Sequence, residues 1–219
     1  VNVSEAARWF KLASDQGELS ARCAYAISLL ESEGAPEKVH EGLRILKTTA
    51  EAGCGEAQLN LGSVYMKGLG VHQSSERAFK FFKQAAEGGN TEAQIAIGVL
   101  CETGKGVKQD IAEALKWYRQ SAELGNARAQ TILGSMYEKG NGVDRSLPEA
   151  VIWYRKAADQ GDVNAQAFLG MLYARSDTGL PQDLVSALRL LKSAADAGNA
   201  PSQMALGMCY ERGEIVERD

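Results

Sequence analysis

Apolar and small residues recur along the chain with the spacing of one helix face. In residues 56–68, Ala57, Leu61 and Tyr65 are four residues apart, and residues 77–90 repeat this spacing in Ala78, Phe82 and Ala86. The spacing predicts amphipathic helices of about a dozen residues each. Because isolated helices of this length are marginal in water, each is expected to pack against its neighbours.

The helix pattern itself repeats every 36 residues. The loop "KGLGVHQS" begins at Lys67, "TGKGVKQD" at Thr103 and "KGNGVDRS" at Lys139. The helix before the loop recurs as "EAQLNLGSVYMKG", "EAQIAIGVLCETG", "RAQTILGSMYEKG" and "NAQAFLGMLYARS". We call this helix A and the helix after the loop helix B. Repetition at such a period is typical of solenoid proteins.

The repeats divide the whole chain. We predict a single solenoid domain over residues 1–219, in which residues 1–18 form helix B of a preceding repeat. Full repeats are predicted over residues 19–54, 55–90, 91–126, 127–162 and 163–199, with helix A and the loop of a truncated repeat over 200–219. The start at Val1 rather than methionine and the stop at Asp219 lead us to expect more chain at both ends.

The glycine-rich loop around Lys105 raises two interpretations, a phosphate-binding loop or a turn. A phosphate loop follows a strand and places GK[ST] after its spacer, whereas here a helix precedes and Gly106 follows the lysine. We therefore predict a turn in which Gly104 is a left-handed C-cap and Gly106 permits a second sharp turn. Asp110 is expected to cap the next helix in a capping box with Glu113, and Ser146 with Glu149 repeats this pattern.

A glycine also recurs inside helix A, where it is unfavourable by about 1 kcal/mol. We expect close contact between helices to outweigh this cost at each position, which are Gly62, Gly98, Gly134, Gly170 and Gly207. The loops of the first and fifth repeats depart from the pattern, with "SEGAPEKV" in one and Arg175-Ser176-Asp177 in the other, so we expect them to differ in shape.

The pattern from Ala93 to Gly125, AxxxxAQxxLGxxYxxGxGVxxDxxxAxxWYxxAAxxG, resembles Sel1-like repeats, relatives of the tetratricopeptide repeat. This resemblance implies an all-α fold, a right-handed α-solenoid of antiparallel helix pairs with helices A on the concave face. It also implies an adaptor or scaffold, since the family includes bacterial envelope proteins, host-contact factors and immunity proteins against secreted lipase toxins.

Composition narrows the function classes. A net charge of −4 and a pI of about 5.4, with no basic cluster, give no electrostatic attraction to nucleic acid or an anionic membrane. No run of 18 apolar residues predicts a membrane span. His40 and His72 are the only histidines, which leaves little material for a zinc site or a histidine-based triad, and no cofactor is predicted.

The four cysteines form no CxxC motif and are expected to be scattered thiols, although one disulfide stays open as an alternative. They are Cys23, Cys54, Cys101 and Cys209.

We number helix-A positions from the alanine that begins the repeat pattern, so that Ala57 is the first residue in the repeat 55–90. By analogy with tetratricopeptide repeats, the third and seventh residues in this numbering and those after the tyrosine position should line a concave groove. The alternative is that they pack between adjacent helices. The predicted partner-binding residues are Leu59, Ser63, Met66, Ile95, Val99, Glu102, Thr131, Ser135, Glu138, Ala167, Met171, Arg175, Met204 and Met208.

We therefore expect a non-enzymatic module that binds a protein or peptide segment in its groove. A bacterial envelope or periplasmic factor, such as an immunity protein or virulence adaptor, is the favoured setting, and a cytoplasmic scaffold is the alternative. Two other functions stay open: a hydrolase using clustered carboxylates, and a structural scaffold that assembles end to end.

Overall fold

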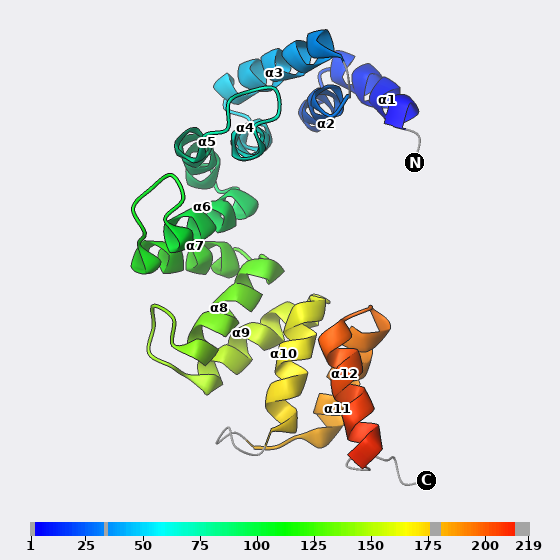
Figure 1. Cartoon of the computed structure of the whole chain (residues 1–219), viewed down its shortest axis with the longest axis vertical. Coiled ribbons are helices and arrows are strands. Elements are labelled where there is room, and N and C mark those ends of the chain that lie inside the picture. The colour runs from blue at the N-terminus through cyan, green and yellow to red at the C-terminus, as the bar shows by residue number, and fades with distance from the viewer. Residues whose placement is uncertain (1–2, 33–34, 176–180, 213–219) are drawn as a thin grey trace. The chain divides into compact units, whose positions relative to one another are not determined.

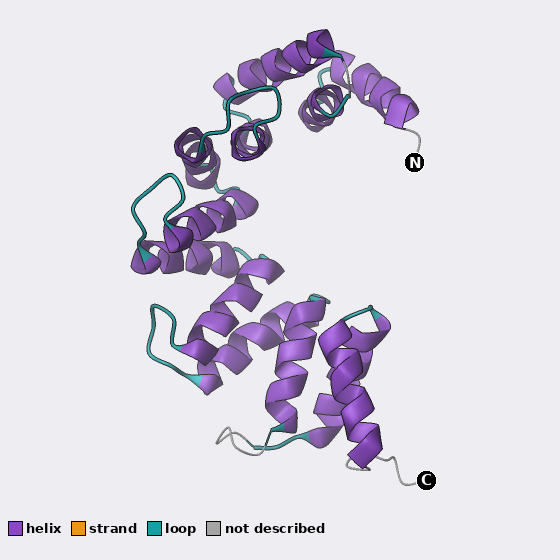
Figure 2. Cartoon of the chain, viewed as in Figure 1, coloured by secondary structure: helices purple, strands orange, loops and turns teal. Residues whose placement is uncertain are grey.

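The computed structural model describes residues 3–32, 35–175 and 181–212, and these residues contain only helices and loops (Figure 2). The expected differences in the loops of the first and fifth repeats fall largely on residues 33–34 and 176–180, which lie outside the described residues. Twelve helices follow one another in the described chain, as labelled in Figure 1. They are α1 (Val3–Asp15), α2 (Leu19–Leu30), α3 (Pro36–Glu51), α4 (Gly55–Lys67), α5 (Ser75–Glu87), α6 (Thr91–Thr103), α7 (Ile111–Glu123), α8 (Ala127–Lys139), α9 (Leu147–Asp159), α10 (Val163–Ala174), α11 (Leu184–Asp196) and α12 (Ala200–Arg212).

The helices form two compact units, residues 1–117 and 118–219, with the boundary inside α7. In the first unit each helix from α2 to α6 packs on the one before it, and α2 also contacts α4. In the second unit α8 to α12 pack in the same sequential way, and α10 also contacts α12. This sequential pairing of helices in 36-residue repeats is the solenoid-like packing that the repeat pattern predicts.

Helices A and B of one repeat meet through a small residue and a large one. A Cβ on Gly62 would lie 2.5 Å from the Phe82 ring, and one on Gly134 would lie 2.6 Å from the Tyr154 ring. Both rings are buried, so the missing side chain lets the helices approach to native packing density. The predicted role of helix-A glycine is confirmed here, but it is wrong for Gly207, whose added Cβ would meet no described atom within 4 Å.

The loop devices are formed largely as the sequence predicts. Gly104 is the left-handed C-cap of α6, with φ 69°, and Gly106 has φ 74°. The side chain of Asp110 accepts a hydrogen bond of 2.9 Å from the Glu113 N–H, which confirms the N-cap. The second half of the predicted capping box is different, because the Asp110 N–H donates to the carbonyl oxygen of Cys101. The last turn of helix A therefore supplies the acceptor that a capping box assigns to glutamate.

Candidate functional site

The residues predicted to line the groove have two different environments. The third residues of helices A are buried in α6, α8 and α10: Ile95 is 2%, Thr131 8% and Ala167 2% exposed. Thr131 also donates a hydrogen bond of 3.1 Å to Asp162, the N-cap of α10. These side chains therefore pack inside the repeats, and Leu59 is half-buried at the equivalent position of α4.

The solvent-facing side of helices A is formed by the fourth, seventh and eleventh residues, which we call the A-helix stripe. Six of its twelve members are half-buried and six are exposed, the exposed ones being Lys67, Val99, Thr103, Lys139, Phe168 and Arg175. On α4, α6, α8 and α10, with the C-cap of α10, the stripe comprises Asn60, Ser63, Lys67, Ala96, Val99, Thr103, Ile132, Ser135, Lys139, Phe168, Met171 and Arg175.

A shallow pocket in the first unit supports this definition of the stripe. Its wall includes Ala24 and Ile27 of α2 and the C-cap Glu31, which are the fourth, seventh and eleventh residues counted from Ala21. The neighbouring α4 contributes Glu56 and Asn60. Equivalent faces of successive helices A thus form one continuous surface in this part of the unit.

Fourth-position residues are the part of this surface that the sequence analysis missed. Phe168 is 38% exposed and Ile132 half-buried, and neither was predicted to bind a partner. A shift of one residue turns a helix by about 100°, so counting from the third residue selects the buried side. The sequence signal was the change from Asn60 and Ala96 to large apolar residues at this position in later repeats.

The predicted residues after the tyrosine position are Met66, Glu102 and Glu138, and their carbonyl groups hold the loops. These carbonyls accept hydrogen bonds of 2.7, 2.8 and 3.0 Å from the side chains of Gln73, Gln109 and Arg145. The Glu138 carboxylate also accepts a 2.8 Å hydrogen bond from the Tyr154 hydroxyl.

The final two predicted residues, Met204 and Met208, lie on α12. They are 66% and 44% exposed.

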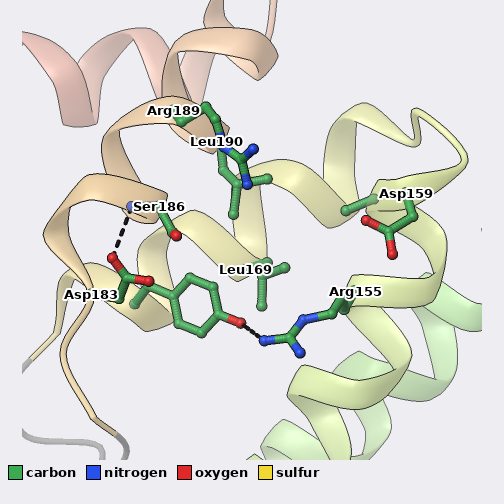
Figure 3. Close-up of a pocket in the computed structure, with 9 residues that line it drawn as sticks. Arg155, Asp159, Leu169, Asp183, Ser186, Arg189 and Leu190 are labelled. Atoms are coloured by element: carbon green, nitrogen blue, oxygen red, sulfur yellow. Dashed lines mark hydrogen bonds between the residues drawn. The ribbon is translucent and has the colours of Figure 1, made fainter.

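A polar pocket lies between α9, α10 and α11 (Figure 3). The Arg155 guanidinium donates to the Tyr173 hydroxyl, and the Asp183 carboxylate accepts from the Ser186 N–H at 2.9 Å, which lowers the pKa of Asp183. The repeat before it has the same arginine–tyrosine contact, from Arg119 to Tyr137 at 2.9 Å. These two contacts are therefore part of the repeat architecture.

Within the described ranges, no group of three or more His, Cys, Asp and Glu side chains could hold a metal ion. None of the helices in the part of the chain that the structure describes is both long enough and apolar enough to cross a bilayer.

The repeats match a known protein family. The Sel1 repeat pattern matches residues 1–18, 55–90, 91–126, 127–162, 163–199 and 200–219, which together exceed half of the chain. The chain is a Sel1 repeat protein. Sel1 repeats are protein-interaction modules, and the family is generally non-catalytic. Residues 19–54, where Ala26 and Leu29 replace the usual glycine and tyrosine, lie outside the matched ranges.

Solved structures with similar folds include other Sel1 repeat proteins. A Sel1 repeat protein from Oxalobacter formigenes is 32% identical, with a TM-score of 0.81 over 97% of this chain and 91% of that one. A protective antigen present in uropathogenic Escherichia coli strains is 29% identical, with a TM-score of 0.66 over all of this chain and 54% of the antigen. This chain thus spans about half the length of that antigen.

An immunity protein from Pseudomonas aeruginosa is 20% identical, with a TM-score of 0.56 over 84% of this chain and 67% of that one, a likeness of fold alone. A comparison with curated proteins finds no match.

The contact between Tyr154 and Glu138 predicts a pH dependence of this Sel1 repeat protein. Burial, followed by the hydrogen bond to Glu138 and its charge, raises the pKa of Tyr154 above its ordinary value. The folded state therefore holds this proton more tightly than the unfolded state, so the stabilisation is complete below about pH 10 and is lost as the pH rises. We expect the loss to approach about 1.4 kcal/mol per pH unit above pH 10.

Tyr154→Phe separates this contribution from the titration of other groups. Urea unfolding between pH 8 and 11 should show wild type losing its advantage over the variant as the pH rises. A difference between the two proteins that stays constant across this range would contradict the assignment.

Proposed function

We propose that this Sel1 repeat protein binds segments of another protein through the part of the A-helix stripe in each of its two units. The observation that carries the proposal is the exposure of large apolar side chains on that stripe, with Val99 and Phe168 each 38% exposed. Apolar area left in water is unfavourable by roughly 25 cal/mol per Å² relative to burial. A partner that covers these side chains recovers that free energy. Exposed apolar patches therefore serve as interaction sites, and we assign this role to the stripe.

The second unit suggests the chemistry of the partner segment. In α8 and α10, Ile132, Phe168 and Met171 occupy the fourth and seventh positions, and the eleventh positions are Lys139 and Arg175. Ser135 holds the seventh position of α8, so the stripe is apolar along α10, partly apolar along α8, and basic at the C-terminal end of both helices. A segment with apolar side chains followed by an acidic residue complements this pattern.

The biological setting that we propose is the bacterial envelope, where the chain would dock or neutralise a partner as an immunity protein or a virulence adaptor. Support comes from the protective antigen among the similar structures and from the shared fold of the immunity protein. A lipase toxin is the first partner to test because the resemblance noted in the sequence implies one. Fractionation of cells that express the native protein, with detection in periplasm and cytoplasm, tests the setting separately from the binding surface.

The test of the binding surface is a pair of substitutions, Val99→Asp and Met171→Asp, made singly and together. An aspartate carboxylate placed in an apolar contact loses its hydration on binding and gains no charged partner in return. We therefore expect each change to weaken binding about 10-fold or more. Partners captured from the native source by the wild-type chain and identified by mass spectrometry should be lost with the double variant. Their affinities are then measured with purified proteins.

Ile152→Asp is the matched control, because Ile152 is 47% exposed on helix B of the fourth repeat. This variant should retain the partner and its affinity. Circular dichroism and thermal unfolding establish that all variants fold. Equal retention of the partner by folded double variant and control would contradict the proposed surface.

A further inference from the structure

Two cysteines occupy positions that the repeat architecture brings together. Cys23 is the third residue of helix A in the repeat 19–54, and Cys54 is the N-cap of the next helix A, α4. In the repeat 127–162 these two positions hold Thr131 and Asp162, whose side chains are joined by a hydrogen bond of 3.1 Å. The backbone of a Sel1 repeat therefore places the side chains of this pair of positions in direct contact.

The first repeat has the same arrangement. α2 and α4 pack against each other, Cys23 is completely buried and Cys54 is half-buried. The Cys54 thiol is close enough to Cys23 to be, after burial, a cause of the raised pKa of Cys23, and both thiols are free in this structure. They lie 31 residues apart in sequence, with α3 between them.

Cys54 also departs from a rule that the other repeat junctions follow. The equivalent residues cap the next helix A through their side chains, with hydrogen bonds of 2.8–3.1 Å, and they are Asn90, Asn126, Asp162 and Asn199. Cys54 makes no side-chain cap hydrogen bond. Because Asn and Asp are strongly preferred N-caps, cysteine gives up local stability at this junction. A different role for the thiol would account for the exchange.

We propose that Cys23 and Cys54 form a disulfide bond that links α2 to the start of α4. The bond would close a loop around α3 and restrict the unfolded chain, which is the main way in which disulfides stabilise proteins. The bond would also hold helices A of two successive repeats together at the start of α4. There the N-cap Cys54 makes no side-chain hydrogen bond, unlike Asn90, Asn126, Asp162 and Asn199. The proposal is independent of the proposed partner-binding function.

The bond forms by thiol–disulfide exchange with an external disulfide such as oxidised glutathione. The Cys54 thiolate attacks one glutathione sulfur and releases the other as a thiolate. The Cys23 thiolate then attacks Cys54 and releases the second glutathione. Two electrons pass from the protein to glutathione, and the two thiol protons end on the released glutathione molecules.

Burial, followed by the neighbouring Cys54 and Glu56, raises the pKa of Cys23 to about 12. The second step is therefore expected to be slow in the native chain and faster at higher pH.

Oxidation of the full chain tests the proposal. The protein is incubated with oxidised glutathione at pH 8, both in the native state and during refolding from urea, and free thiols are then blocked. Trypsin places the two cysteines in separate peptides, residues 23–38 and 48–67, so mass spectrometry detects the linked pair directly. We expect these peptides to be linked and the melting temperature to rise by about 5–10 °C over the reduced protein.

Two variants serve as controls. Cys54→Asn introduces the cap found at the other junctions, and its melting temperature should not respond to oxidation. Cys101→Ser removes a buried thiol outside the pair and should leave the 23–54 link intact. A stable glutathione adduct on Cys54, a link to another cysteine or a link between two chains, in both native and refolded samples, would overturn the proposal.

Discussion

Gly106→Ala is expected to lower the free energy of unfolding of the unit formed by residues 1–117 by about 2–5 kcal/mol. Gly106 has φ 74°, a left-handed conformation that is unfavourable for alanine by about 1–2 kcal/mol. The added Cβ would also lie 2.4 Å from the carbonyl carbon of Ser75 and 2.6 Å from its oxygen. These are backbone atoms at the start of α5, so relief requires a shift of the helix, at a typical overpacking cost of about 1–3 kcal/mol.

Gly89→Ala separates the two parts of this effect. Gly89 has φ 85°, but an added Cβ would meet no described atom within 4 Å. This variant should therefore lose only the conformational part, about 1–2 kcal/mol. Urea unfolding followed by circular dichroism compares the variants, and equal losses would contradict the contact between the loop and α5. A phosphate-binding role for the loop would instead predict ligand-dependent effects with little change in stability.

Tyr154→Ala is expected to cost the second unit about 3–5 kcal/mol, the range for removing a buried aromatic ring. Tyr154 is completely buried, and its ring fills the space left by Gly134. It packs in a cluster with Ala150, Leu169 and Leu172. The truncation leaves a cavity between α8 and α9, and we expect the surrounding side chains to fill it only in part.

Tyr154→Phe is the matched control for this prediction. It keeps the ring and removes only the hydroxyl that donates to Glu138, so a loss of about 0.5–1.5 kcal/mol is expected at neutral pH. Urea unfolding at pH 7 measures both variants. Similar losses for Phe and Ala would show that the hydrogen bond, not the packing of the ring, dominates.

Helix ends were predictable from sequence because their chemistry is local. The left-handed C-cap at Gly104 and the N-cap at Asp110 depend on the residue itself and on backbone groups within three or four positions of it. The same reasoning failed for the second half of the capping box. Its acceptor is the carbonyl of Cys101, which belongs to the preceding helix and is brought near only when helices A and B pack.

The candidate site was less predictable because a binding surface depends on which side of a helix its neighbours cover. Ile95 and Thr131 are apolar or small enough for either environment, and only the contacts of the following repeat show that they are buried. Gly207 shows the same limit, because the sequence predicted a close helix contact there and the structure has none among the described residues. Its sequence context matches Gly62, but no described side chain packs against it.

The sequence by itself determined the 36-residue period, the alternation of helices A and B, the turn at Gly106 and membership of the Sel1 repeat family. These follow from periodicity and from residues with restricted backbone or capping chemistry, which act over a few positions. The tertiary structure alone decided that the third residues of helix A in α6, α8 and α10 are buried and that Phe168, at a fourth position, is exposed. It also decided that Cys23 and Cys54 are neighbours where α2 packs against α4. Both depend on how one repeat packs on the next, which residues distant in sequence determine together.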